Sequence, residues 1–349
     1  MDHEELRRLR LDALLVTNLP HVRYLTNFSG TSGVCLVRPR GVLFLTDSRY
    51  TRQAASEVKY ASCRSTSEDL VAAAGRTIAD SRFSRIGFES EFLSVHQLGM
   101  LKKTARGVTP VPTRGVVEGI AGIKERDEIA SIRKAIGITE KVFESIIDKV
   151  RPGVSEADIA SEISFLQKRL GAGGDAFEPI VASGKRSAFP HARPSGKKIR
   201  AGDGVILDFG CTVEGYHSDM TRTVFAGKAD PRMRRAYNAV LEARNAAVDQ
   251  VRAGVRTSMV DGVARRILAR YGLAKYFTHS LGHGLGLSIH EPPRISPLSK
   301  ESLHAGNTVT IEPGVYLPDR GGIRIEDMVL VTSTGCEVLS SIPRTLTIV

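Results

Sequence analysis

The sequence predicts an α/β (α+β) protein of two domains, residues 1–118 and 119–349. The chain of 349 residues is longer than a usual single domain. Over its first third, short apolar runs rich in β-branched residues alternate with helical stretches, as in a small α/β domain. The rest of the chain repeats one order of helices and strands at a spacing of about 105 residues, which predicts a second domain with an internal two-fold pseudo-repeat.

The first domain is expected to hold a buried sheet with helices between its strands. The strand candidates are the apolar runs DALLVT, GVCLVR, GVLFLTD and RIGFES. Helices are expected at about 49–58 and 68–81. The stretch 111–124 is rich in Pro and Gly, so it is expected to be a linker.

The second domain is expected to open with a long amphipathic helix at about 125–149, ended by Pro152. Ser155 is the predicted N-cap of a second helix. Strands are expected at 178–182 and 205–225. The second copy should follow the same order: a helix over 231–252, a break at Gly254, a helix ending at Arg270, and strands to the C-terminus.

Two ten-residue stretches carry the repeat most clearly. Residues 201–210 read AGDGVILDFG and residues 305–314 read AGNTVTIEPG. Asp208 and Glu312 therefore occupy the same place in the two copies. Because a fold of two such halves brings both stretches to one central site, the sequence predicts a chemical role for these acids.

The composition limits the classes of function. The net charge is +11, but the basic residues are spread along the chain, so nucleic acid is not expected as a partner. No run of about 18 apolar residues occurs, so no membrane association is expected. The charged start MDHEELRRLR is unlike a secretory signal, and the four cysteines lack CxxC spacing. These features predict reduced thiols in a cytoplasmic protein.

The first acidic hairpin reads GVILDFGCTVEGYHSDMTRTVF. A turn centred between Val213 and Glu214 places Asp208 directly opposite Asp219. Opposed residues project from the same face with Cβ atoms about 5 Å apart. Two carboxylates this close raise one pKa unless a cation lies between them. The hairpin therefore predicts a cation site, and two divalent ions about 3.5–4 Å apart would fit.

The second acidic hairpin reads TIEPGVYLPDRGGIRIEDM. A turn centred near Asp319 leaves Glu312 and Glu326 opposed across the hairpin. Arg324 should share the face of Glu326, since it lies two residues before it. A further candidate ligand is His283 in THSLGHGLGLSIHE, where glycines let the backbone approach a site closely.

Together these side chains form a candidate metal site of four carboxylates and one imidazole: Asp208, Asp219, His283, Glu312 and Glu326. A hard, oxygen-rich donor set suits Mn, Co or Fe better than a structural zinc. The alternative is that they are ordinary surface acids, because hairpins often carry Asp and Glu. Two opposed pairs, related by an internal repeat and lying beside a Gly-His-Gly sequence, favour the metal site.

Other histidines give weaker signals. His191, in AFPHARP, is a candidate for substrate binding or for capping a strand. His279 and His290 flank His283, and each is a candidate either for the site or for a structural hydrogen bond. His217, in the first hairpin, is expected to be exposed.

Several motifs of the chain resemble those of the pita-bread-fold metallopeptidases, most closely the proline-specific branch of small aminopeptidases P and prolidases (Xaa-Pro dipeptidases). They are LDFG with SDMTRT, HSLGHGLGLSIHE, TIEPG and GGIRIED. The resemblance covers nearly the whole chain. It implies a creatinase-like N-terminal α/β domain followed by a pita-bread catalytic domain, and a homodimer like its relatives.

The resemblance also implies a role for each candidate site residue. Asp219 and Glu326 would bridge two divalent ions, Asp208 would complete the shell of one, and His283 and Glu312 would bind the other. Manganese is the expected metal, with Co, Zn and Fe as alternatives. The implied catalytic or substrate-binding residues are Glu312, His191, His279, His290 and Arg324.

The expected activity is hydrolysis of the N-terminal Xaa-Pro bond of peptides with proline at the second position. YLTNFSG and TDSRYTRQA favour an aminopeptidase, and a prolidase acting on dipeptides is the alternative. A non-catalytic pita-bread binding protein and a hydrolase of another C–N bond are further alternatives. Arg186 stands where the family commonly has asparagine, which leaves the substrate contacts beside it open.

Overall fold

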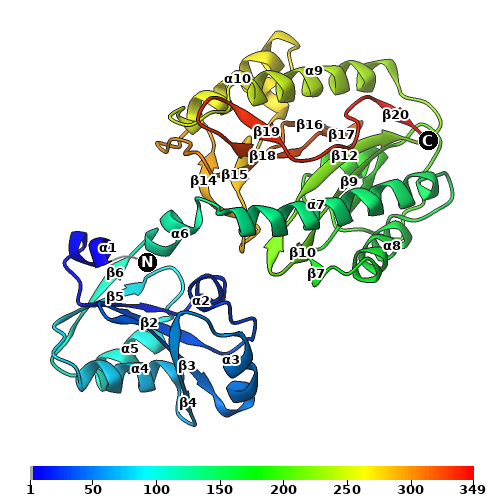
Figure 1. Cartoon of the computed structure of the whole chain (residues 1–349). Helices are drawn as coiled ribbons and strands as arrows, with labels where there is room; N and C mark the ends of the chain where they lie inside the picture. The colour runs from blue at the N-terminus through cyan, green and yellow to red at the C-terminus, as the bar shows by residue number, and fades with distance from the viewer. Residues whose placement is uncertain (1–2) are drawn as a thin grey trace. The chain divides into compact units, whose positions relative to one another are not determined.

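The computed structural model describes residues 3–349, so the first two residues of the predicted 1–118 domain lie outside the described residues (Figure 1). The chain divides into two compact units, Met1–Ala121 and Gly122–Val349. Among the described residues, no helix has both the length and the apolar character that a membrane crossing requires.

The first unit is built on a six-stranded sheet of order β4-β3-β2-β1-β5-β6. Its strands are β1 (Ala13–Val16), β2 (Val34–Arg38), β3 (Gly41–Asp47), β4 (Ala61–Thr66), β5 (Arg85–Glu89) and β6 (Thr109–Thr113). Its helices are α1 (His3–Arg8), α2 (Leu19–Thr26), η1 (Ser48–Tyr50), α3 (Thr51–Glu57), α4 (Leu70–Ala79), α5 (Val95–Thr104) and α6 (Val116–Ala121).

Both faces of this sheet are covered, which explains its continuous apolar strands. In β1, Ala13 and Leu15 pack with α4 and α5, whereas Leu14 and Val16 pack with α2, α3 and α6. The sequence predicted α3 and α4 but missed α2 and α5. The prediction of a linker over 111–124 was wrong, because the end of β6 and the whole of α6 fall within it. Pro110 and Pro112 are tolerated because β6 is an edge strand, where a missing N–H can face away from β5.

The second unit contains two helix pairs and several sheets. Its helices are α7 (Arg126–Ile146), η2 (Ile147–Lys149), α8 (Glu156–Arg169), η3 (Gly184–Ala188), α9 (Pro231–Val248), α10 (Thr257–Arg270) and η4 (Ala274–Tyr276). Its strands are β7 (Gly174–Asp175), β8 (Ile180–Ser183), β9 (Gly204–Phe209), β10 (Cys211–Val213), β11 (Tyr216–His217), β12 (Met220–Phe225), β13 (Gly282–Gly284), β14 (Glu291–Ile295), β15 (Thr308–Ile311), β16 (Gly314–Leu317), β17 (Gly321–Arg324), β18 (Asp327–Val331), β19 (Cys336–Val338) and β20 (Thr347–Ile348).

The predicted pseudo-repeat is visible in this unit. One half packs α7 and α8 on the sheet β20-β12-β9-β8, and the other packs α9 and α10 on the sheet β14-β13-β15-β18-β19. Figure 1 shows the strands lying between the two helix pairs. The N-cap of α8 was predicted correctly, since Ser155 Oγ accepts the N–H of Asp158 at 3.1 Å.

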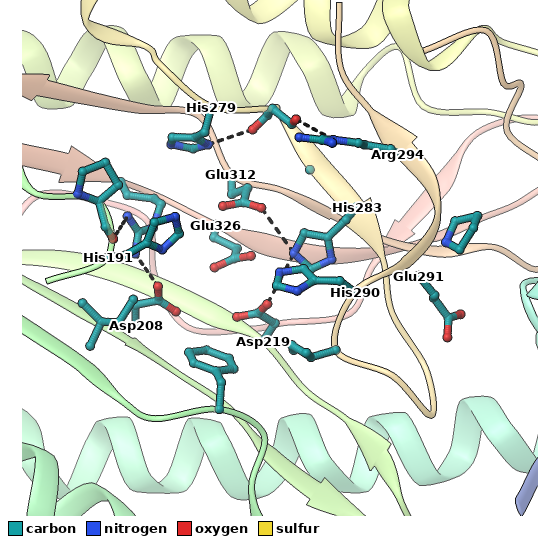
Figure 2. Close-up of a pocket in the computed structure, with 18 of the residues that line it drawn as sticks. His191, Asp208, Asp219, His279, His283, His290, Glu291, Arg294, Glu312 and Glu326 are labelled. Carbon is teal, nitrogen blue, oxygen red and sulfur yellow. Dashed lines mark hydrogen bonds and ion pairs between the residues drawn. The ribbon is translucent and has the colours of Figure 1, made fainter. Parts of the chain in front are cut away.

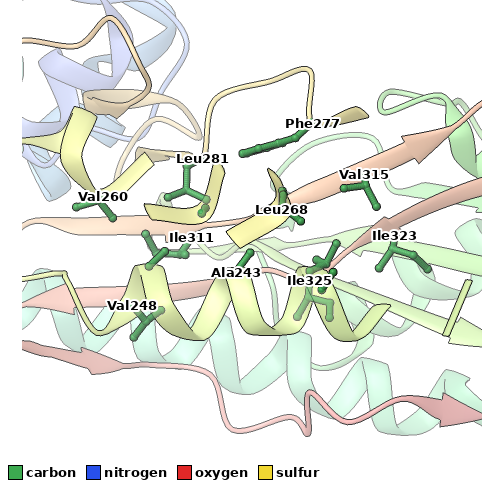
Figure 3. Packing of buried hydrophobic residues seen from close by; sticks show 14 of the residues in the cluster. Ala243, Val248, Val260, Leu268, Phe277, Leu281, Ile311, Val315, Ile323 and Ile325 are labelled. Carbon is green, nitrogen blue, oxygen red and sulfur yellow. The ribbon is translucent and has the colours of Figure 1, made fainter. Parts of the chain in front are cut away.

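An apolar core holds the second half together (Figure 3). Ala243 of α9 and Leu268 of α10 face Ile311 of β15 and Ile323 of β17, and all four are fully buried. Burying one such aliphatic side chain stabilises the fold by about 1.5–3 kcal/mol, less for alanine. This packing fixes the backbone of the strands that carry the second acidic hairpin.

The structure corrects the register predicted for the first hairpin. Asp208 pairs with Thr221, not with Asp219. The turn is the tight pair Glu214-Gly215, both with positive φ, so its centre lies one residue later than predicted. A later centre moves each partner by two residues and keeps it on the same face. Asp208 and Asp219 therefore still face one cavity.

The register predicted for the second hairpin is confirmed. Ile311 pairs with Asp327 in β15 and β18, and Gly314 pairs with Arg324 in β16 and β17. The same register on both sides places Glu312 opposite Glu326. Four carboxylates from two hairpins thus converge inside the second unit.

Candidate metal centre

The five predicted ligands lie around one cavity of about 690 Å³ in the second unit (Figure 2). They come from strand segments far apart in the chain, and each lies in or directly beside a strand of the two central sheets. His191, His279, His290 and Arg324 line the same cavity. The structure therefore brings every sequence-predicted site residue together.

Three of the five approach closely enough to share one cation. Asp219, His283 and Glu326 each offer a ligand atom, and these atoms all lie within 4.8 Å of one another. His283 Nε2 also lies 3.4 Å from Glu312 Oε1 and 3.8 Å from Asp219 Oδ2. Figure 2 shows the imidazole of His283 and the carboxyl groups of Glu312, Glu326 and Asp219 pointing toward a common space.

The backbone around His283 fixes its ring. A Cβ atom on Gly282 would lie 1.9 Å from the carbonyl oxygen of Thr310, so only glycine allows β13 to approach β15 this closely. His283 Nδ1 lies 3.0 Å from the carbonyl oxygen of Gly284. Because a carbonyl only accepts, Nδ1 carries the hydrogen and Nε2 keeps its lone pair toward the carboxylates.

Asp208 leaves an unsatisfied oxygen in the cavity wall. Its Oδ2 pairs with the guanidinium of Arg324, which also donates to Tyr316 Oη at 2.7 Å and to Thr221 Oγ1 at 3.1 Å. Its Oδ1 is buried and has no hydrogen-bond partner among residues 3–349. A buried carboxylate oxygen without a donor is costly, and a cation would satisfy it.

The electrostatics of the cluster fit a divalent metal. Burial, reinforced by the neighbouring carboxylates, raises the pKa of both Asp219 and Glu326 well above the usual value. Burial likewise raises the pKa of Glu312 to about 8, against the opposing effect of Arg324. Burial and then His290 lower the pKa of His283 to about 4, so its ring is neutral at pH 7. Divalent cations in place of the protons would relieve this repulsion, and the oxygen-rich donor set suits them.

The three pocket histidines differ in their bonding. His279 is neutral at pH 7, because burial and then Arg324 lower its pKa to about 4. Its Nδ1 contacts the carbonyl oxygen of Ser280 and its Nε2 contacts Tyr316 Oη. The rings of His191 and His290 have no hydrogen-bond partner in the described chain. Unlike the ring of His279, they remain available to donate a hydrogen bond to a substrate. His217 is half-buried rather than exposed, and it is held by the carbonyl of Gly286.

Sequence reasoning missed two functional candidates. Tyr316 lies four residues after Glu312 and joins Arg324 to His279, so the period of two along the strand could have identified it. Arg294 lies in β14 and lines the cavity, but no local pattern marks it. Arg186, the unusual residue of the sequence, bonds to Glu156 and to the carbonyl of Arg193, so it holds the segment that carries His191.

Comparisons with known proteins identify the family of the chain. Residues 130–333 match metallopeptidase family M24, and residues 3–120 match the creatinase/prolidase N-terminal domain. A Xaa-Pro dipeptidase of Pyrococcus horikoshii is 34% identical over 96% of this chain and 94% of its own. The solved structure of a Xaa-Pro dipeptidase from Bacillus anthracis has a TM-score of 0.95 and 38% identity, covering 99% of both chains.

A solved X-Pro aminopeptidase from Thermotoga maritima has a TM-score of 0.91 and 34% identity, covering 99% of this chain and 100% of the other. These similarities confirm the predicted fold class and the predicted resemblance to the proline-specific branch. They extend over both units and include the whole of the cavity. The chain therefore belongs to metallopeptidase family M24, with a creatinase/prolidase N-terminal domain before its peptidase domain.

Proposed function

We propose that the protein is a metal-dependent hydrolase of Xaa-Pro bonds and that Xaa-Pro dipeptides are its preferred substrates. Relatives over nearly the whole chain are named Xaa-Pro dipeptidase or prolidase. The dipeptidase, given above as the alternative, is thus better supported than the aminopeptidase that YLTNFSG and TDSRYTRQA favoured.

The dipeptide preference rests on Arg294, a cationic side chain in the cavity lining. Its side chain lines the cavity, and its Nε donates to Ser280 Oγ at 3.0 Å. Glu301 accepts the backbone N–H of Arg294, not its guanidinium. Within residues 3–349 no carboxylate forms an ion pair with this guanidinium. The free carboxylate of a dipeptide is the anion that it would bind, and a longer peptide has no charge at that position.

The proposed metal ligands are the four carboxylates and the imidazole that surround the cavity. Asp219 and Glu326 would lie between two divalent ions, with Asp208 on one ion and His283 and Glu312 on the other. Two such ions lower the pKa of a water molecule and polarise a carbonyl oxygen. Manganese is proposed first because carboxylate oxygens suit it, and cobalt, zinc and iron are the alternatives.

Side chains of the protein would transfer the protons during hydrolysis. As in any peptide bond, the nitrogen of a Xaa-Pro bond must receive a proton as the C–N bond breaks, and proline then leaves as a secondary amine. Glu312 lines the same cavity as the other candidate ligands. Its carboxylate can accept a proton from the attacking water and deliver it to the proline nitrogen. His290 and His191, whose rings are free to donate, would bind the oxygen of the scissile carbonyl.

The direct test is a paired assay on Ala-Pro and Ala-Pro-Ala, with Mn, Co or Zn added in turn to metal-free protein. We expect the dipeptide to have the higher kcat/KM. Arg294→Leu should raise KM for Ala-Pro by about ten- to a hundred-fold and leave Ala-Pro-Ala within two-fold, since one charge-assisted contact contributes about 1.5–3 kcal/mol. Lys300→Leu, an exposed cation outside the cavity lining, is the control. A wild-type preference for Ala-Pro-Ala, or an equal loss on both peptides, would contradict the dipeptide assignment.

Two further properties are proposed. A homodimer follows from the resemblance alone, and light scattering on purified protein tests it. A cytoplasmic location is supported by four free cysteines, and fractionation of cells tests it. A non-catalytic role is the remaining alternative, and protein that binds no divalent metal would favour it.

A further inference from the structure

A buried ion pair lies in the wall of the cavity, beside the candidate ligands. Lys124 Nζ contacts Glu291 Oε1, and the two side chains are only 1% and 11% exposed. Removing two charges from water is costly, and an apolar pair of similar volume is often no less stable. Stability alone therefore does not explain why these two charged side chains are buried here.

The backbone of Lys124 is anchored in the second unit. Its N–H donates to the carbonyl oxygen of Gly306 at 2.8 Å. Two residues earlier, the carbonyl oxygen of Gly122 accepts from Asn307 Nδ2 at 2.8 Å. Because the backbone is held at Lys124 and two residues before it, the lysine offers Glu291 a rigid partner.

The ion pair packs against the glycine-rich segment that follows His283. A Cβ atom on Gly286 would lie 2.6 Å from Lys124 Cε and 3.0 Å from Glu291 Oε1. The carbonyl oxygen of Gly286 accepts from the N–H of His217, and His217 Nδ1 is also 2.9 Å from it. His217 lies two residues before Asp219, so the packing reaches both walls of the metal centre.

Glu291 directly follows His290. Figure 2 shows the carboxylate of Glu291 pointing away from the acidic cluster, while the ring of His290 lies against that of His283. The two imidazole rings are 4.3 Å apart, with an interplanar angle of 73°. His290 directly precedes β14, so fixing the side chain of Glu291 constrains the backbone from which the ring of His290 projects in the opposite direction.

We infer that Lys124 is a positioning residue, which through Glu291 holds the ring of His290 against His283 and toward the substrate. The inference rests on the proposed function for the role of His290 as a donor to the scissile carbonyl. The geometry of the ion pair itself is independent of that function. A purely structural pair would change stability when removed but would leave His290 in place.

The test uses full-length protein with Lys124→Met and with the double variant Lys124→Met/Glu291→Met, which leaves no unpaired buried charge. Lys149→Met is the matched control, since Lys149 pairs with Glu162 on the surface, with side chains 50% and 31% exposed. With saturating Mn, kcat on Ala-Pro should fall at least ten-fold in both Lys124 variants, while KM stays within two-fold. The double variant should melt near the wild-type temperature and still be slow.

A second measurement needs neither metal nor turnover. Ring ¹H–¹⁵N spectra of histidine-labelled, metal-free protein report on His290, whose signal is assigned by its loss in His290→Asn. The signal should shift in both Lys124 variants and stay in place in Lys149→Met. An unmoved His290 signal, or a double variant with wild-type kcat, would overturn the inference. If wild-type protein hydrolyses no Xaa-Pro peptide, the proposed function fails and the spectra alone decide the inference.

Discussion

Replacing Glu312 by glutamine should make the metal-free protein more stable and the metal-loaded protein less stable. The glutamine keeps the shape of the side chain and can still accept the hydroxyl of Thr310, which lies 3.2 Å from Glu312 Oε1. It removes a buried acid that burial forces to hold a proton up to about pH 8. The change therefore separates the electrostatic cost of the site from its packing.

The magnitude follows from the pKa of Glu312, which is 4.5 ordinarily and about 8 in the folded chain. At pH 7 the folded protein keeps a proton that the unfolded chain releases. This costs about 1.4 kcal/mol for each pH unit above 4.5, roughly 3 kcal/mol in all. The stability gain of Glu312→Gln should therefore be about 3 kcal/mol at pH 7, and below about 1 kcal/mol at pH 5. For a unit of this size, 3 kcal/mol raises Tm by roughly 6–12 °C.

The assay is calorimetry of chelator-treated wild type and Glu312→Gln at pH 5 and pH 7, with and without added Mn. Metal binding stabilises only a protein that retains its ligands, so the order of Tm should reverse when Mn is added. A metal-free variant no more stable than wild type at pH 7 would refute the reasoning. So would a gain of the same size at pH 5 and pH 7.

Three other predictions follow from the same site. Asp219→Ala or Glu326→Ala should abolish metal uptake and turnover with an unchanged circular dichroism spectrum, and wild-type activity in either would show that it is not a ligand. Metal-free wild type should lose stability as pH rises from 7 to 8, because over this range the buried acids of the folded chain keep protons that the unfolded chain has released, while the pocket histidines are largely neutral in both states; metal uptake at pH 7 should then release protons into a weakly buffered solution, and their absence would contradict the raised pKa values of the buried acids. Gly282→Ala should cost at least about 2 kcal/mol and weaken metal binding, because its Cβ would lie 1.9 Å from the carbonyl oxygen of Thr310; Gly137→Ala, in open space on α7, should instead stabilise by about 0.5–1 kcal/mol, and an equal loss in both would contradict the close approach of β13.

The sequence was informative about the site because the site lies on hairpins. Strand periodicity and the internal repeat placed Asp208 and Glu312 in equivalent positions, and the structure brings both to one cavity. The error of one residue in the first turn did little harm, because it changed the partner of Asp208 from Asp219 to Thr221 without changing its face. Strand periodicity and the internal repeat were therefore enough to predict which acidic residues meet at the site.

Contacts between distant segments were beyond those rules. The pairing of Arg324 with Asp208 and of Lys124 with Glu291 depends on how sheets and helices pack, which no local pattern encodes. The same holds for Arg294, whose importance appears only when β14 forms a wall of the cavity. The linker prediction failed for a related reason, since β6 becomes a strand only by pairing with β5.

The most direct test of the metal centre is anomalous diffraction from crystals of the protein grown with Mn. The account predicts two manganese peaks per chain inside the cavity, each within coordination distance of side chains among Asp208, Asp219, His283, Glu312 and Glu326. Manganese peaks elsewhere, or none in crystals whose five side chains are well ordered, would contradict it.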